Sequence, residues 1–190
     1  VLLMVTVYVT IGSGGSSKFS LLQGAGKNDS AGKTVGNSLM ALTISGIILM
    51  VVTLIFLQPL MVLFGAKGET LELATAYTRI IAIGAPFQIL GAGSSMLIRA
   101  DGSPKYAMAS TLIGAVLNII LDPICIFTLD MGIEGAAIAT IIGQMVSAVF
   151  SLAYFRKFKS VHLKKEYFSL NGTSSSPIED SLARWVMMSV

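Results

Sequence analysis

Four long stretches with almost no charged side chains constrain this chain more than any other feature of its sequence. They cover residues 34–66, 80–98, 106–129 and 135–155, and Asp122 is the one charged residue inside them. A helix of about 20 apolar residues crosses the ~30 Å hydrocarbon layer of a bilayer, because each residue adds about 1.5 Å. Lipid offers no hydrogen-bond partners to a backbone, so such segments must be helical. The sequence therefore predicts an all-α, polytopic membrane helix bundle.

The composition agrees, since hydrophobic residues are 54% of the chain and charged residues only 12%. Soluble domains carry about 25% charged residues. A shorter apolar segment at the start adds a fifth predicted span. We expect about five transmembrane helices, over about 1–17, 36–64, 73–98, 106–129 and 133–155. The first span lacks the charged start and cleavage site of a signal peptide, so we expect further sequence upstream of it.

Lysine and arginine are distributed unevenly between alternate connections. One set of connections holds ten of them: Lys18, Lys27, Lys33, Arg99, Lys105, Arg156, Lys157, Lys159, Lys164 and Lys165. The opposite set holds only Lys67 and Arg79. Because cytoplasmic loops carry the excess of basic residues, the first set of connections is predicted to face the cytoplasm. The protein is predicted to lie in the plasma (inner) membrane. The pI of about 9.1 is thus a sign of topology, and no nucleic-acid partner is expected.

Two regions follow from this pattern. Residues 1–155 form the predicted transmembrane helices. Residues 156–190 are predicted to be a cytoplasmic amphiphilic loop and the truncated start of a following helix. The segment Ser176-Pro177-Ile178-Glu179 has the form of a capping box with proline at the first helical position.

No constellation for catalysis is visible, and we expect neither an enzyme nor an organic cofactor. Cys125 and His162 each stand alone. The segment Gly26–Thr34 ends in Gly-Lys-Thr, like a phosphate-binding loop. It has five residues between its glycines instead of four, and a predicted membrane helix rather than a strand precedes it. We interpret it as a cytoplasmic loop with topology-setting lysines.

Small residues indicate where helices pack closely. Gly135, Ala139 and Gly143 recur every four residues in the last span. Such a face lets a neighbouring backbone approach, which matters in lipid because no hydrophobic drive pairs the helices. Gly12, Gly14 and Gly15 in the first span allow either close approach or a local bend.

Asp122 is the most informative polar residue, because a carboxylate inside a span costs roughly 2.5–3.5 kcal/mol on insertion scales. Asn118 precedes it by four residues and so lies on the same helix face. Pro123 follows it and has no N–H for the carbonyl of Ile119. Oxygen atoms that could bind a cation are therefore expected close together on this helix.

Depth in the membrane brings two further residues to the same level. Counted from the outer ends of their spans, Asp122, Asn118, Thr140 and Gln88 lie about 8–16 Å deep. Oxygen donors of this kind suit hard cations. We predict a Na⁺-binding or proton-coupling site at these four residues, with Na⁺ at Asp122, Asn118 and Thr140. A neutral hydrogen-bond cluster with protonated Asp122 is the alternative.

The segment Arg99–Pro104 follows the third predicted span. Glycine and proline in this segment favour a tight turn. We interpret Asp101 and Pro104 as turn residues, with a gating salt bridge as the alternative.

In this order and spacing, several short motifs resemble those of the multidrug and toxic compound extrusion (MATE) transporters. The resemblance covers about residues 12–155. Its motifs are Gly12-Ser13-Gly14-Gly15, Ser20, Gly24-Ala25-Gly26-Lys27, Ala31, Gly84-Ala85-Pro86, Arg99–Pro104, Leu117–Pro123 and Met131–Thr140.

The resemblance implies a fold and a function. MATE transporters have two lobes of six helices, and they export drugs and organic cations in exchange for Na⁺ or H⁺. This chain is similar to helices two to six of the N-terminal lobe, a partial MATE-type lobe. In the family, an Asn and an Asp on helix five and a Thr on helix six bind the cation, which match Asn118, Asp122 and Thr140. A polar amide on helix four is similar to Gln88.

The expected function is therefore that of a fragment of a secondary antiporter. Its expected partners are cationic or amphipathic small molecules, the bilayer, and the first helix and C-terminal lobe of the same protein. A flippase for lipid or polysaccharide precursors is one alternative, although no basic residue lies deep in the spans. A non-transporting membrane subunit is another, although it would need no buried carboxylate.

Overall fold

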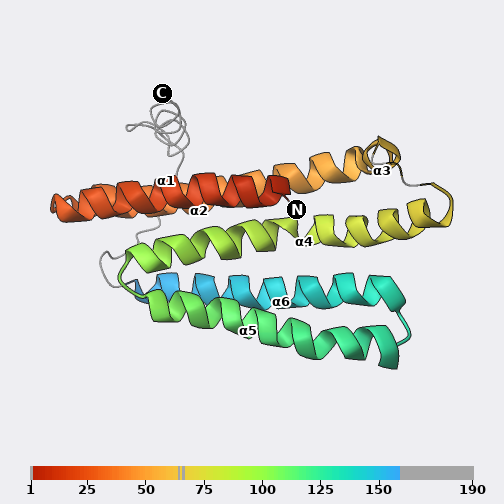
Figure 1. The fold of residues 1–190 in the computed structure, drawn as a ribbon. Helices are drawn as coiled ribbons and strands as arrows, with labels where there is room; N and C mark the ends of the chain where they lie inside the picture. Colours follow the sequence, from red (N-terminus) through yellow and green to blue (C-terminus); the bar gives the residue numbers. More distant parts are fainter. Residues whose placement is uncertain (1, 64, 66, 159–190) are drawn as a thin grey trace.

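The computed structural model describes residues 2–63, 65 and 67–158, and these form a helical bundle (Figure 1). The helices are α1 (Leu2–Gly24), α2 (Asn28–Ile55), α3 (Leu57–Leu63), α4 (Glu69–Ala100), α5 (Pro104–Pro123) and α6 (Gly132–Tyr154). A π-helical turn, η1 (Ile124–Thr128), extends α5, and a 3₁₀ turn, η2 (Phe155–Lys157), follows α6. The all-α prediction is confirmed. The expected capping box and cytoplasmic loop lie almost wholly outside the described residues.

Helix α4 is the centre of the bundle. It contacts each of the other five α-helices, and Figure 1 shows it between the α1–α2 pair and the α5–α6 pair. In its most apolar stretch 56% of residues are buried, against 28% or less in the other candidate spans. Consecutive long helices run antiparallel, as short connections require.

Four of the described helices are both long and apolar enough to cross a membrane. They are α2, α4, α5 with its π-helical extension η1, and α6. Five spans were expected, and the difference is α1. This helix has 23 residues, so it is long enough, but it runs past Ser17 to Gly24. Its second half carries Lys18 and several serines and glycines, which lower its mean hydropathy.

Helix α2 differs from the predicted span 36–64 at both ends. Helix α2 begins at Asn28, and its first turns include the exposed pair Lys33 and Asp29, with nitrogen and carboxylate oxygen 3.3 Å apart. It begins this early because Gly26 adopts a φ of 72° and turns the chain sharply after α1. The helix ends at Ile55, and the short helix α3 follows after Phe56. Charged residues were excluded from the predicted span, but a helix can extend beyond the hydrocarbon layer.

Glycines set the spacing of the helices, as predicted. A Cβ atom on Gly143 would lie 2.7 Å from the carbonyl oxygen of Gly114, and one on Gly135 2.7 Å from that of Cys125. Two of the first-span glycines, Gly12 and Gly15, serve close approach. A Cβ on Gly12 would lie 3.3 Å from Gly93 Cα, and one on Gly15 would overlap the side chain of Ser38.

One hydrophobic cluster closes the end of the bundle that carries the basic connections. It combines residues from the end of α1, the start of α2, the end of α4, the start of α5 and the end of α6: Phe19, Ala31, Val35, Leu39, Leu97, Ile98, Ala107, Tyr154 and Phe158. All these helix ends therefore meet at one side, as the alternating topology requires. The assignment of this side to the cytoplasm stays a prediction.

Candidate functional site

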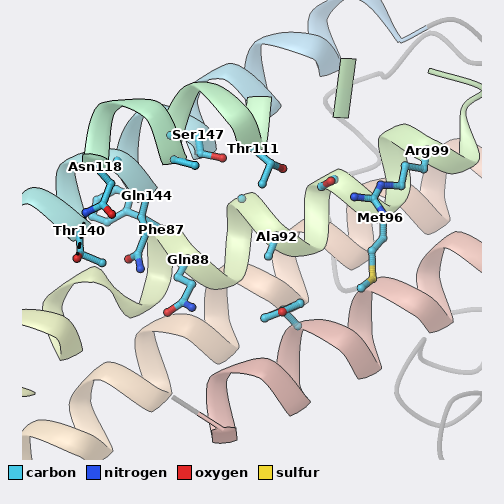
Figure 2. Close-up of a pocket in the computed structure, with 16 residues that line it drawn as sticks. Phe87, Gln88, Ala92, Met96, Arg99, Thr111, Asn118, Thr140, Gln144 and Ser147 are labelled. Carbon is cyan, nitrogen blue, oxygen red and sulfur yellow. Dashed lines mark hydrogen bonds between the residues drawn. The ribbon is translucent and has the colours of Figure 1, made fainter. Parts of the chain in front are cut away.

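A cavity of about 510 Å³ lies among α1, α4, α5 and α6. Figure 2 shows lining residues at two opposite ends of the cavity, with Ser147 and Thr111 between them. Asn118, Thr140, Gln88 and Gln144 lie at one end, while Arg99 and Met96 lie at the other. The first group is nearer the predicted outer side, because Arg99 is the penultimate residue of α4 at the predicted cytoplasmic end.

Three of the four predicted site residues form one hydrogen-bonded cluster. The side-chain amide of Asn118 donates to Asp122 Oδ1 at 3.2 Å and to Thr140 Oγ1 at 3.3 Å. The Thr140 hydroxyl in turn donates to the Ala136 carbonyl at 2.9 Å. Both amide hydrogens of Asn118 therefore face acceptors, which determines the orientation of its amide.

The local sequence positions each member of this cluster. Asn118 and Asp122 share a face of α5 because they are four residues apart. Pro123 ends the regular helix, and the next turn is π-helical, with the Leu129 N–H donating to the Ile124 carbonyl. The Ile124 N–H donates to the Leu121 carbonyl, three residues back, instead of to a carbonyl four residues back.

Close packing of α5 and α6 brings Thr140 to this face. Gly114 and Gly143 lie so close that a Cβ on either would meet the other's carbonyl oxygen at 2.6–2.7 Å. A Cβ on Gly143 would also lie 3.4 Å from Asn118 Cβ. The glycine pair thus determines the distance between the two halves of the cluster.

Asp122 is not among the residues that line the cavity. Asn118 and Thr140 line the cavity, whereas Asp122 lies behind Asn118 and contacts it by the hydrogen bond. The charge of Asp122 would therefore act on the cavity through Asn118.

The cluster has the oxygen atoms for a monovalent cation or a proton. Two acceptors remain after its internal hydrogen bonds, namely Asn118 Oδ1 and Asp122 Oδ2. Within the described part of the chain, no three His, Cys, Asp or Glu side chains gather. One carboxylate with neutral oxygens suits a hard, singly charged cation better than a transition metal.

Comparison with known proteins decides the family. The MatE family model matches residues 1–124. The multidrug export protein MepA of Staphylococcus aureus (strain MSSA476) is 38% identical over 151 residues, covering 79% of this chain and 33% of that protein.

The chain belongs to the MATE family.

Solved MATE structures agree along most of the chain. An inward-facing multidrug resistance MATE transporter superposes with a TM-score of 0.85 at 31% identity, over 95% of this chain and 41% of that one. An outward-facing structure gives 0.85 at 30% identity, over 94% and 40%. The TM-score is therefore the same against the inward-facing and the outward-facing structure. It spans about a third of the length of the curated MATE relatives it matches.

Gln88, the fourth predicted site residue of this MATE chain, borders the cavity from α4. It forms no hydrogen bond with Asn118, Asp122 or Thr140 in the described structure. Gln88 therefore lines the cavity as a polar side chain that is separate from the hydrogen-bonded cluster.

Gln144 was missed by the sequence reasoning. It lines the same cavity, and its Oε1 is buried with no hydrogen-bond partner among the described residues. Gly84 leaves room for it, since a Cβ there would lie 3.0 Å from that oxygen. The signal was its position four residues after Thr140, on the same face of α6. A buried acceptor without a partner is costly, so it is a candidate contact for a ligand N–H.

Asp101 lies in a turn, as predicted, but it also makes a tertiary contact. Gly102, with a φ of 74°, does make the turn, and Pro104 begins α5. Asp101, however, is only 4% exposed and accepts a hydrogen bond of 2.7 Å from the Tyr154 hydroxyl. That hydroxyl also lies 2.6 Å from Ser103 Oγ. The α4–α5 turn of this MATE chain is thereby fastened to the end of α6.

Tyr154→Phe is expected to lower the free energy of unfolding by roughly 1–3 kcal/mol, because it leaves buried polar atoms of Asp101 and Ser103 without this partner. The midpoint of thermal unfolding in detergent would measure the loss. Tyr106→Phe is the matched control, since the hydroxyl of Tyr106 donates to the Phe150 carbonyl at an exposed position. Equal losses in both variants would contradict a structural role for the buried hydrogen bonds.

Proposed function

We propose that this chain is part of a secondary antiporter of the plasma (inner) membrane. The antiporter exports cationic or amphipathic small molecules, including drugs, while Na⁺ or H⁺ moves inward. The name of MepA, a multidrug export protein, supports this cargo class. The complete transporter would also contain the first helix and the second lobe of a MATE transporter.

The cluster of Asn118, Asp122 and Thr140 is the observation that carries the proposal. It places one carboxylate and neutral oxygens beside an interhelical cavity. A carboxylate within a membrane span is expensive, and such residues mark ion or proton pathways. A purely structural subunit would not need a carboxylate in a membrane span.

The coupling mechanism follows from the hydrogen bonds. Protonation of Asp122, or Na⁺ at its free oxygen, changes the charge that the Asn118 amide faces. Asn118 also contacts Thr140, so the change would reach both α5 and α6. A ligand shifts a conformational equilibrium only by its differential affinity for the two states. Cation binding would supply that difference, and the opposite lobe would respond.

A flippase for lipid or polysaccharide precursors is the second candidate function, and one observation favours it. Arg99 lines the cavity, and a guanidinium suits the phosphate of such a precursor. The sequence had suggested that the spans offer no deep cation. Arg99 lies at the end of α4 rather than at mid-depth, so we favour the antiporter.

Ethidium efflux tests the proposal directly. The full reading frame that contains this chain would be expressed in bacteria that lack their own efflux pumps. Efflux should exceed that of the empty vector severalfold, and it should accelerate when an inward Na⁺ or pH gradient is imposed. Efflux that ignores both gradients would refute cation antiport. A protein that instead moves a fluorescent anionic lipid between leaflets would support the flippase.

A further inference from the structure

Two hollows in the lobe share a wall. The interhelical cavity extends inward as far as Met96 and Arg99. A second hollow, of about 410 Å³, lies toward the predicted cytoplasmic ends of α1 and α4 and is lined by Ser16, Ser17, Ser20, Ala100 and the same two residues. In the described structure, Met96 and Arg99 are the side chains that line both spaces.

Met96 fills the crossing of α1 and α4. Its sulfur lies where a Cβ on Gly12 would come within 2.8 Å, and Gly12 also faces Gly93 across the crossing. The crossing thus lacks other side-chain bulk at these two positions. Methionine has three rotatable bonds and adapts to irregular space. A rotamer change at Met96 could therefore open the wall without moving a helix.

Arg99 gives the same wall a charge. It is the only charged residue among the side chains that line either hollow in the described part of the chain. Arginine stays protonated at any physiological pH. A fixed positive charge raises the free energy of a second cation nearby, although water weakens this effect at Arg99, which is exposed. The wall is therefore less permeable to cations than to neutral molecules of similar size.

We propose that Met96 and Arg99 form a gate between the cavity and the cytoplasmic hollow. Met96 closes the passage by its bulk, and Arg99 closes it to cations by its charge. The gate would delay release of the coupling ion from the Asn118–Asp122–Thr140 cluster until the lobe changes state. The identity of the passing ion rests on the proposed function, whereas the gate itself does not.

Accessibility of a cysteine inside the cavity tests the gate. The full reading frame would carry Cys125→Ala to remove the one cysteine of this chain, and Ser147→Cys as a reporter that lines the cavity. Inside-out membrane vesicles expose the cytoplasmic side to a methanethiosulfonate reagent that carries a trimethylammonium group. A neutral reagent of similar size is used in parallel.

In Met96→Ala, labelling with both reagents is expected to be about tenfold faster. In Arg99→Gln, labelling with the cationic reagent is expected to be about tenfold faster. In Arg99→Gln the neutral reagent should gain much less. Met96→Leu and Arg99→Lys keep the bulk and the charge, so both should label slowly. Lys105→Gln is the control, because Lys105 lies on the same side but lines neither hollow.

Unchanged labelling in both Met96→Ala and Arg99→Gln would overturn the gate. Equal acceleration by Lys105→Gln would overturn the local role of Arg99, because any surface charge would then suffice. The readout needs no transport. If Met96→Ala and Arg99→Gln accelerate labelling in a protein that shows no ethidium efflux, the gate is supported and the proposed antiport is refuted.

Discussion

Asp122→Asn is expected to lower cation-coupled ethidium efflux by about 10- to 100-fold, the range of typical coupling free energies between sites. Asparagine has nearly the shape of aspartate, and its oxygen can still accept the hydrogen bond from Asn118. The substitution therefore removes the charge and the ability to bind a proton while it keeps the packing. Efflux would be measured over a series of Na⁺ concentrations and external pH values, so that lost coupling is separated from lost expression.

Asp130→Asn is the matched control for this charge. Asp130 lies in the connection between η1 and α6, is exposed, and has a φ of 51°, which asparagine adopts readily. We expect it to keep efflux at the parent level. If Asp122→Asn also kept both efflux and its cation dependence, Asp122 would have no role in coupling, and the mechanism proposed for the cluster would be wrong.

Gly143→Leu is expected to have the largest effect on stability, a loss of roughly 3 kcal/mol or more by overpacking. Its first added carbon would lie 2.7 Å from the Gly114 carbonyl oxygen, which belongs to a backbone and cannot rotate away. Helices α5 and α6 must separate to accept it. Since the same contact holds Asn118 near Thr140, the hydrogen bond of the cluster should also be lost.

The yield of monodisperse protein on size-exclusion chromatography and the midpoint of thermal unfolding would measure this effect. Gly24→Leu provides the comparison, because a Cβ at Gly24 meets nothing within 4 Å. It should leave yield and midpoint close to the parent values. Equal behaviour of the two variants would show that α5 and α6 tolerate a wider spacing than the structure indicates.

Much of the candidate site could be predicted from one helix at a time. Asn118 and Asp122 share a face because of the helical period, and a count along antiparallel helices places Thr140 at a similar depth. Their hydrogen bonds agree with that prediction. Whether they bind a cation is a separate question, which the efflux experiments address.

The rotation of each helix about its own axis could not be predicted in this way. It keeps Asp122 out of the cavity lining, and it turns Gln144 toward the cavity with an oxygen that has no hydrogen-bond partner among the described residues. It also buries Asp101 beneath Tyr154. These contacts join residues 53 positions apart in the last case, and no local pattern encodes them.

The sequence by itself determined the class of this protein and the order of its helices. Lipid cannot satisfy a polar backbone, so uncharged stretches of this length have one stable solution, and short connections make neighbours antiparallel. The tertiary structure alone decided where α2 begins, which oxygens face the cavity, and that Met96 and Arg99 stand between two hollows. Those features depend on how closely glycine-bearing faces approach, and that distance arises only when the helices pack together.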